Sequence, residues 1–319
     1  MTDTAMDTAA SPFPEQARLE AMVEDIIARA RQFGADGVEA GVSIDAGLSV
    51  TVRLGETETL EYNHDRMLGL TVYFDHRKGS ASTADFAPGS IAATVQAACD
   101  IARYTSEDAC AGLADAERMA SEIPDLDLYH PWNLDAGRAI ELATECEAAA
   151  LAVDKSIENS EGGTVSSYVG MRVKGNSHGF LGGYRGSHHS ISCSVIGKRG
   201  EEMQRDYWSE TCRDYRDLPA PALIGRTAGE RALRRLGTRR LSTRETPVVF
   251  VAEVARSLFG NFVNAVTGSS LYRNASFPDI MACRFLYITV FSCLGRPNSH
   301  QRMPVIWSRH RDGVYFFII

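Results

Sequence analysis

Two adjacent histidines, His188 and His189, are the residues whose type and spacing most readily suggest metal or acid–base chemistry. They precede a stretch in which apolar residues alternate with serines up to Val195, which predicts a strand with one buried face. Neighbouring residues on a strand point to opposite faces, so a regular strand cannot bring both imidazoles to one metal ion. We therefore expect the two side chains to point to opposite faces of the strand, with His189 on the apolar face.

Other candidate side chains are better explained by local structure. His64, His76 and His178 each lie beside an asparagine or aspartate in segments that we expect to be turns. The serines of residues 156–194 include no Gly-x-Ser-x-Gly elbow. Glycine-rich pieces near Gly162 and Gly182 lack the order of a dinucleotide site and indicate hairpin turns or bulges. We therefore predict no catalytic, cofactor-binding or metal-binding residue.

The elements that must position these side chains begin with a meander between Leu48 and Phe74. Apolar and polar residues alternate there, which predicts antiparallel strands with one buried face. Turn formers interrupt the pattern at Gly55-Glu56, Asn63-His64-Asp65 and 75–79. A helix precedes the meander, from Glu15 to about Gly34, and another begins at Pro88.

A similar arrangement follows in the second half of the chain. The periodicity predicts a helix from about Asp135 to Val153, a strand-rich block over 157–215 and a basic helix over 219–236. The arginines at 231, 234, 235, 239 and 240 indicate a solvated or interface helix face rather than an anion site. Seven cysteines without a Cys-x-x-Cys pair predict reduced thiols, with Cys99 and Cys146 buried.

Many short segments resemble the TldD/PmbA metallopeptidase family, on its PmbA (TldE) side. They are Glu61-Tyr62-Asn63, 68–73, 77–82, 100–105, Cys110-Ala111-Gly112, 124–128, Glu161-Gly162-Gly163, 175–179, Arg205-Asp206-Tyr207 and Leu241-Ser242-Thr243. The resemblance ends near Phe277. Together with the patterns above, it implies an α+β fold with antiparallel sheets and flanking helices in two amino-terminal domains, plus the start of a truncated third domain.

The resemblance also bears on the metal. Zinc-carrying members of the family have a His-Glu-x-x-x-His element on a helix that corresponds to residues 253–267 here. In this chain the helix reads Arg256-Ser257-Leu258-Phe259-Gly260-Asn261, and no histidine lies between Ser190 and Ser299. Arginine stays protonated in proteins and cannot ligate zinc. The resemblance therefore implies no zinc in this chain and zinc in a TldD-type partner subunit.

The function implied is that of the non-zinc subunit of a heteromeric metallopeptidase. The pair would cut unfolded or short peptides in the cytoplasm, with family roles in peptide antibiotic maturation and antitoxin degradation. One alternative is a stand-alone metalloprotease, although the missing zinc motif leaves no reason to expect catalysis by this chain alone. Another alternative is an inactive truncated product.

Composition agrees with a globular protein that binds neither nucleic acid nor membranes. The 319 residues are 44% hydrophobic and 23% charged, with a formal net charge of −8. An acidic chain is a poor match for nucleic acid. The longest uncharged apolar run, Phe285 to Leu294, is far shorter than the roughly 20 residues of a membrane helix. The acidic first thirty residues lack a signal-peptide pattern, so we expect a cytoplasmic protein.

The last part of the chain departs from these patterns. Residues 247–251 predict a buried strand and 253–267 a helix that buries Val254, Leu258, Phe262 and Ala265. The tail after Phe277 is basic and unpatterned, with five arginines against two aspartates, as a shifted reading frame would produce. The predicted organisation is a flexible lead (1–14), a first domain (15–110), a linker (111–126), a second domain (127–240), the start of a carboxy-terminal domain (241–277) and an atypical tail (278–319).

Overall fold

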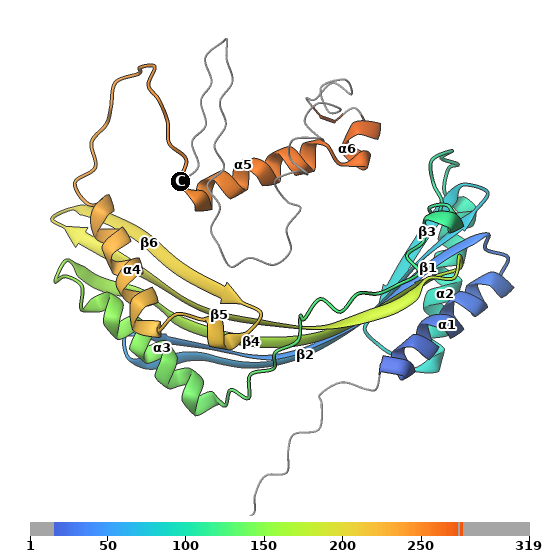
Figure 1. The fold of residues 1–319 in the computed structure, drawn as a ribbon, viewed down its shortest axis with the longest axis horizontal. Helices are drawn as coiled ribbons and strands as arrows, with labels where there is room; N and C mark the ends of the chain where they lie inside the picture. Colours follow the sequence, from blue (N-terminus) through green and yellow to red (C-terminus); the bar gives the residue numbers. More distant parts are fainter. Residues whose placement is uncertain (1–15, 274, 277–319) are drawn as a thin grey trace, which may run out of the picture. The chain divides into compact units, whose positions relative to one another are not determined.

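The computed structural model describes residues 16–273, 275 and 276, which are drawn in colour in Figure 1. The chain divides into two compact units, Met1–Thr238 and Arg239–Ile319, and each is described by itself. The predicted lead 1–14 and tail 278–319 lie outside the described residues.

The first unit is built on one six-stranded antiparallel sheet, which is strongly bent (Figure 1). Its strands lie in the order β3-β2-β1-β4-β5-β6. Their bounds are β1 Gly37–Arg53, β2 Glu56–Phe74, β3 Arg77–Thr83, β4 Ile157–Asn176, β5 Leu181–Arg199 and β6 Glu202–Cys212. The α+β fold class with antiparallel strands and flanking helices is therefore confirmed.

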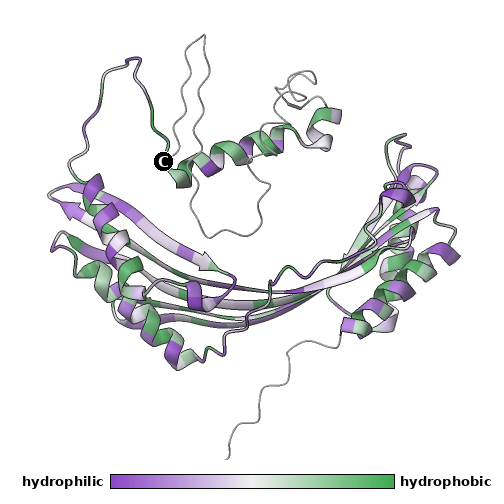
Figure 2. Cartoon of the chain, viewed as in Figure 1, coloured by the Kyte–Doolittle hydropathy of each residue, from purple (hydrophilic) through white to green (hydrophobic). Residues whose placement is uncertain are grey.

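Four helices cover one face of this sheet. Their bounds are α1 Gln16–Gln32, α2 Pro88–Tyr104, α3 Ala136–Leu151 and α4 Pro221–Arg235. Each begins or ends where local chemistry dictates: Pro88 opens α2, Pro221 opens α4, the Asp135 side chain caps α3, and Gly34 follows α1 with a φ of 90°. These helices confirm the predicted helical segments. Figure 2 shows green and purple alternating along them, as expected for helices with one buried side.

Two hydrophobic cores lie under these helices. The first joins α1 and α2 to β1, β2 and β4, and the second joins α3 and α4 to β1, β4 and β5. The two predicted domains therefore share one sheet, because β1 and β4 contribute residues to both cores. At about 3.3 Å per residue, the 17 residues of β1 reach ~56 Å, which is enough to pass both cores. The predicted thiols Cys99 and Cys146 are both fully buried in these cores.

The meander differs from the prediction in β2. The expected turn at Asn63-His64-Asp65 is wrong, because β2 continues through it and pairs with Asp45, Ala46 and Gly47 of β1. A long partner strand offers these residues a continuous ladder, which outweighs their turn propensity. The burial expected for the apolar side chains of this part of the meander is also wrong: Leu54, Leu60 and Tyr62 are 56%, 42% and 68% exposed.

The second unit shows α5 Ala252–Ala265 and the short α6 Gly268–Tyr272 among its described residues. The predicted strand 247–251 is wrong: this segment has no regular structure, and Val248 and Val249 are more than half exposed. A strand needs a neighbour to satisfy its backbone. The predicted burial is also wrong for Val254 and Leu258, which are 47% and 40% exposed. Figure 2 shows α5 mostly in green.

Candidate functional site

The face of the sheet on which no described helix of the first unit packs is the candidate functional surface of that unit. In β1 the even-numbered residues from Val38 to Val52, apart from Ala46, belong to one or the other core, so α1 to α4 all pack on the same face. The odd-numbered residues of β1 point the other way. This helix-free face carries polar side chains throughout its centre.

Hydroxyl groups form two rows across the helix-free face. The rows follow the register from β1 through β4 and β5 to β6 and consist of Ser49, Ser166, Ser190 and Thr211, and of Thr51, Thr164, Ser192 and Ser209. In the first row Ser49 Oγ and Ser166 Oγ lie 2.9 Å apart, and in the second Thr51 Oγ1 and Thr164 Oγ1 lie 3.0 Å apart. The sequence showed the serines of β5 but not this alignment, because alignment depends on register.

Next to these rows the helix-free face is hollowed into a groove of about 970 Å³. The ring of Tyr168 lies over Gly47, where a Cβ atom would come within 2.2 Å of it. Asn63 donates a hydrogen bond to the Tyr168 hydroxyl, 3.1 Å away. The exposed His188 also lines the groove. The groove therefore offers hydrogen-bonding side chains and an aromatic ring.

One ion pair and one further carboxylate place charge in the groove. Arg172 pairs with Asp45 at 3.2 Å, and Asp65 stands directly opposite Asp45 in the ladder. Like charges at directly opposed positions destabilise a sheet unless one of them is neutralised. The Arg172 guanidinium provides that neutralisation for Asp45.

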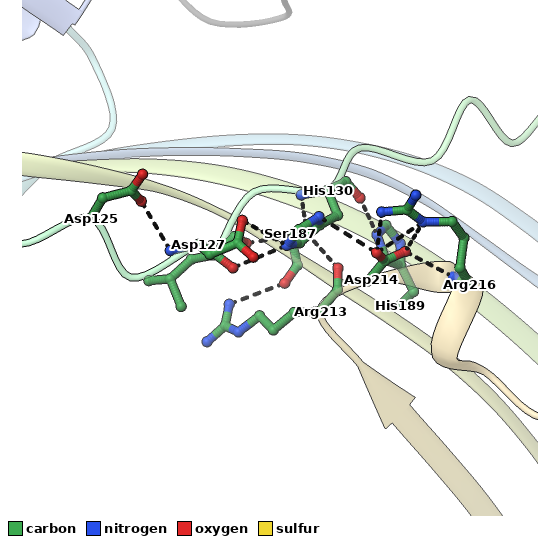
Figure 3. Close-up of polar contacts among 9 residues, drawn as sticks. Asp125, Asp127, His130, Ser187, His189, Arg213, Asp214 and Arg216 are labelled. Carbon is green, nitrogen blue, oxygen red and sulfur yellow. Dashed lines mark hydrogen bonds and ion pairs between the residues drawn. The ribbon is translucent and has the colours of Figure 1, made fainter. Parts of the chain in front are cut away.

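A second polar cluster lies where the segment before α3 crosses the edge of β5 (Figure 3). Ser187 is 1% exposed, and its hydroxyl donates to the Arg213 carbonyl at 2.6 Å. The same hydroxyl accepts from the His130 backbone N–H at 2.9 Å. Its own N–H bonds the Leu128 carbonyl. Ser187 thus holds two segments to the sheet and is not a free nucleophile.

His189 completes this cluster from the buried side of β5. The ring is fully buried against the stacked rings of Trp132 and Tyr215, both of which it meets edge-on, and its Nε2 lies 2.9 Å from the His130 carbonyl. A carbonyl can only accept, so Nε2 carries the proton and Nδ1 accepts from Ser167 at 2.9 Å. Burial lowers the pKa of His189. The histidine is a neutral, satisfied core residue, and the predicted opposite placement of His188 and His189 is confirmed.

His130 and Asp214 extend the cluster, and their side chains are only 19% and 15% exposed (Figure 3). Side-chain and backbone hydrogen bonds from Arg216 lower the pKa of Asp214 to about 2. His130 lies 3.6 Å from Asp214 and 3.3 Å from Asp127. In the described part of the chain, no serine, threonine or cysteine side chain bonds this imidazole, so the cluster clamps loops rather than performing acid–base chemistry. No local pattern in the sequence marks His130 or Ser187, because their contacts span 57 to 59 residues of sequence.

The remaining sequence candidates have structural roles. His76 and His178 lie in turns as predicted, and each ring bonds a backbone carbonyl of the 111–126 segment at 2.9 Å. His64 lies in β2 instead of a turn. Gly162 forms a bulge in β4 with a φ of 108°, as predicted for the glycine-rich piece.

The basic helix α4 is partly neutralised from the sheet side. Arg231 and Arg235 pair with Asp206 at 3.4 and 2.8 Å, and Asp206 is only 7% exposed. Arg231 also lies over the ring of Trp208. These contacts attach α4 to β6 and support the interpretation as a helix face rather than an anion site.

Comparisons with known proteins place this geometry in a family. Two family models match: PmbA/TldA metallopeptidase domain 1 over residues 38–102, and the PmbA/TldA metallopeptidase central domain over residues 129–236. The metalloprotease PmbA of Escherichia coli is 50% identical over 242 residues, which cover 76% of this chain and 54% of the relative. This chain belongs to the TldD/PmbA family.

A second curated relative, the PmbA homologue of Haemophilus influenzae, is 44% identical over 239 residues, covering 75% of this chain and 53% of the relative. The chain therefore spans about half the length of the curated relatives it matches. A Bacteroides thetaiotaomicron structure described as a proposed modulator of DNA gyrase gives a TM-score of 0.74 at 25% identity, covering 80% of this chain and 58% of that one.

The structure of TldE from Thermococcus kodakarensis gives a TM-score of 0.55 at 19% identity, covering 66% of this chain and 47% of that one. This likeness concerns the fold alone.

The TldD/PmbA family is a metallopeptidase family, so the fit of a zinc ion to the described residues can be tested. A zinc site needs three or four convergent His, Cys, Asp or Glu side chains. Within residues 16–273, 275 and 276, no three such side chains are grouped closely enough to hold a metal. Arg256 and Asn261 are exposed on α5. The described residues do not fit a zinc ion.

Within the same part of the chain, no helix combines the length and apolarity needed to cross a membrane.

Proposed function

We propose that this chain is the non-zinc subunit of a TldD/PmbA-type heteromeric metallopeptidase. In this proposal a TldD-type subunit holds the zinc and performs the hydrolysis. This chain contributes the helix-free face as part of a wall beside the substrate. The substrates are unfolded or short peptides in the cytoplasm, including precursors of peptide antibiotics and antitoxins.

The identity of residues 256 and 261 carries the proposal. They stand where zinc-carrying members of the family are expected to have histidine ligands. The guanidinium group of arginine has no lone pair to offer a metal. The Asn261 amide is a weak ligand for zinc, which prefers imidazole, thiolate and carboxylate.

The chemistry of the helix-free face supports the second part of the proposal. Hydroxyl groups both donate and accept hydrogen bonds and carry no charge. Two rows of them can therefore contact the backbone of many peptide sequences without selecting one charge type. Among the residues that the structure describes, the hydroxyls of Ser190 and Ser192 have no hydrogen-bond partner, which leaves them available to a substrate.

A stand-alone metallopeptidase is the second candidate function, and the names of the curated relatives favour it. Both the Escherichia coli and the Haemophilus influenzae relatives are named as metalloprotease PmbA or its homologue. In that case this chain, supplied with zinc, would cleave peptides without any other subunit.

Reconstitution distinguishes the two candidates. Purified chain, a purified TldD-type subunit and their mixture are each incubated with a short fluorogenic peptide and zinc. The proposal expects faster cleavage by the mixture than by the TldD-type subunit alone, and none by this chain alone. Cleavage by this chain alone that a chelator abolishes supports the stand-alone candidate and refutes the proposal.

A further inference from the structure

A stretch of β2 is an uncovered edge of the sheet. β1 pairs with β2 over its whole length, but β3 pairs with its other side only from Leu68 to Phe74. Within the described residues, no strand covers that side of residues 57–65, which we call the open edge. All of these residues are exposed except Asn63, which is half-buried. An edge of this kind presents unpaired N–H and C=O groups that can pair with another extended chain.

The two ends of the open edge are marked by local structure. At one end Glu58 is the extra residue of a bulge opposite Thr51 and Val52, and Arg53 pairs with it at 3.3 Å. At the other end Arg66 lies over the ring of Phe86. Between them lie seven regularly paired residues, which is a typical length for one strand.

The side chains of the open edge differ between its two faces. Glu61 and Asp65 point to the helix-free face, as their partners Ser49 and Asp45 do. Neither carboxylate has an ion pair within the described residues, and residues 57–65 contain no lysine or arginine. Leu60 and Tyr62 point to the opposite face and are 42% and 68% exposed. The open edge is thus acidic on one face and apolar on the other.

This charge pattern argues against a second copy of the chain as the occupant. Antiparallel self-pairing centred on Asn63 would place Glu61 of each copy opposite Asp65 of the other. Like charges at directly opposed positions destabilise a sheet. The outer strand β6 is also acidic, with Glu202, Asp206 and Glu210 against Arg205. A complementary strand must therefore carry positive charge.

We propose that the open edge binds an extended basic peptide as an added strand. Because strand side chains alternate with a period of two, the peptide places one cationic residue opposite Glu61 and another, four residues away, opposite Asp65. Apolar residues stand opposite Leu60 and Tyr62. For a peptide that runs antiparallel to β2, the sequence pattern from its amino to its carboxyl end is basic-x-x-apolar-basic-apolar. This binding depends neither on zinc nor on cleavage. A failure to bind the peptide would therefore leave the proposed function intact, and a failure of the proposed function would leave the peptide binding intact.

Two fluorescent peptides test the proposed spacing on the full chain. Both are short alternations of threonine and valine with two lysines, placed four residues apart in one peptide and three apart in the other. At a spacing of three the lysines point to opposite faces, so one of them meets Leu60 and Tyr62. Fluorescence anisotropy at low salt should show binding of the first peptide at least about tenfold tighter than the second. Equal affinities overturn the proposal.

Variants of the chain then locate the binding. Glu61→Lys with Asp65→Lys should weaken binding of the first peptide at least about tenfold. The matched control reverses two exposed helix residues, Glu145→Lys with Glu230→Lys, and should change affinity less than about twofold, since it alters net charge equally but lies on the helices. Equal losses in both double variants would show only general electrostatic attraction and overturn the proposal.

Hydrogen exchange supplies a readout that charge alone does not move. Saturating the chain with the first peptide should slow exchange of backbone amides within residues 57–65, because an added strand pairs with them. Amides of β6 should be unchanged. Protection confined to β6, or no protection anywhere in β2, contradicts binding at the open edge.

Discussion

The carboxylate of Glu147 should be a main determinant of the stability of the first unit. Glu147 lies on α3 and is 1% exposed, and its two oxygens accept hydrogen bonds from the backbone N–H groups of Leu54 and Gly55 at 2.8 and 3.0 Å. These two residues form the turn between β1 and β2. The side chain therefore fixes the turn that leads into the open edge.

The expected cost of Glu147→Ala follows from these two bonds. A hydrogen bond to a charged group contributes about 1.5–3 kcal/mol, so the pair sets an upper range of about 3–6 kcal/mol. The turn is exposed, and both N–H groups regain water when the carboxylate is removed. We therefore expect a loss of about 2–3 kcal/mol, or ~5–10 °C in Tm for a unit of this size.

Glu147→Gln separates hydrogen bonding from packing. The amide keeps the shape of the carboxylate but has one accepting oxygen, so one of the two N–H groups faces an NH₂ donor. We expect a loss of about 1–2 kcal/mol. Thermal and urea unfolding at pH 7, followed by circular dichroism, measures both variants against the exposed control Glu145→Ala. A glutamine variant as stable as the wild type, or an alanine variant as stable as the control, would refute the reasoning.

Three further predictions concern packing, pH and solubility. Gly225→Ala should cost at least about 2 kcal/mol in urea unfolding, because its Cβ would meet the Cys146 carbonyl oxygen at 1.8 Å, whereas Gly89→Ala has open space and should be nearly neutral. The lowered pKa of His189 means that the unfolded chain binds more protons below about pH 6.5, so stability should fall as the pH drops from 7.5 to 5.5, with a smaller fall in His189→Gln. An unchanged pH slope in that variant would contradict the role of His189. Ending the chain at Leu241 should improve solubility in light scattering, because α5 exposes apolar side chains, and a less soluble short chain would contradict this.

Helices and the faces of strands followed from local patterns in the sequence. The apolar stripe of α2 and the capping Asp135 of α3 are encoded within a few residues, and the alternation after His189 assigned both histidines to their faces. The turn expected at Asn63 failed because a pairing partner in β1 outweighs local propensity. The strand predicted at residues 247–251 is wrong for the opposite reason, since apolar character alone does not supply a neighbouring strand.

Features that depend on register or distant contacts were beyond sequence reasoning. The hydroxyl rows require four strands to align, and the clamp at Ser187 joins β5 to segments on both sides of it in sequence. The open edge depends on where β3 stops, and alternation in β2 does not report the length of its neighbour.

Elemental analysis of a co-purified pair tests the central claim most directly. This chain is purified together with a TldD-type subunit, the two chains are separated without chelator, and zinc per chain is measured after dialysis. The account predicts about one zinc with the TldD-type subunit and none retained by this chain, because Arg256 and Asn261 occupy the expected ligand positions. Stoichiometric zinc retained by this chain would contradict the account.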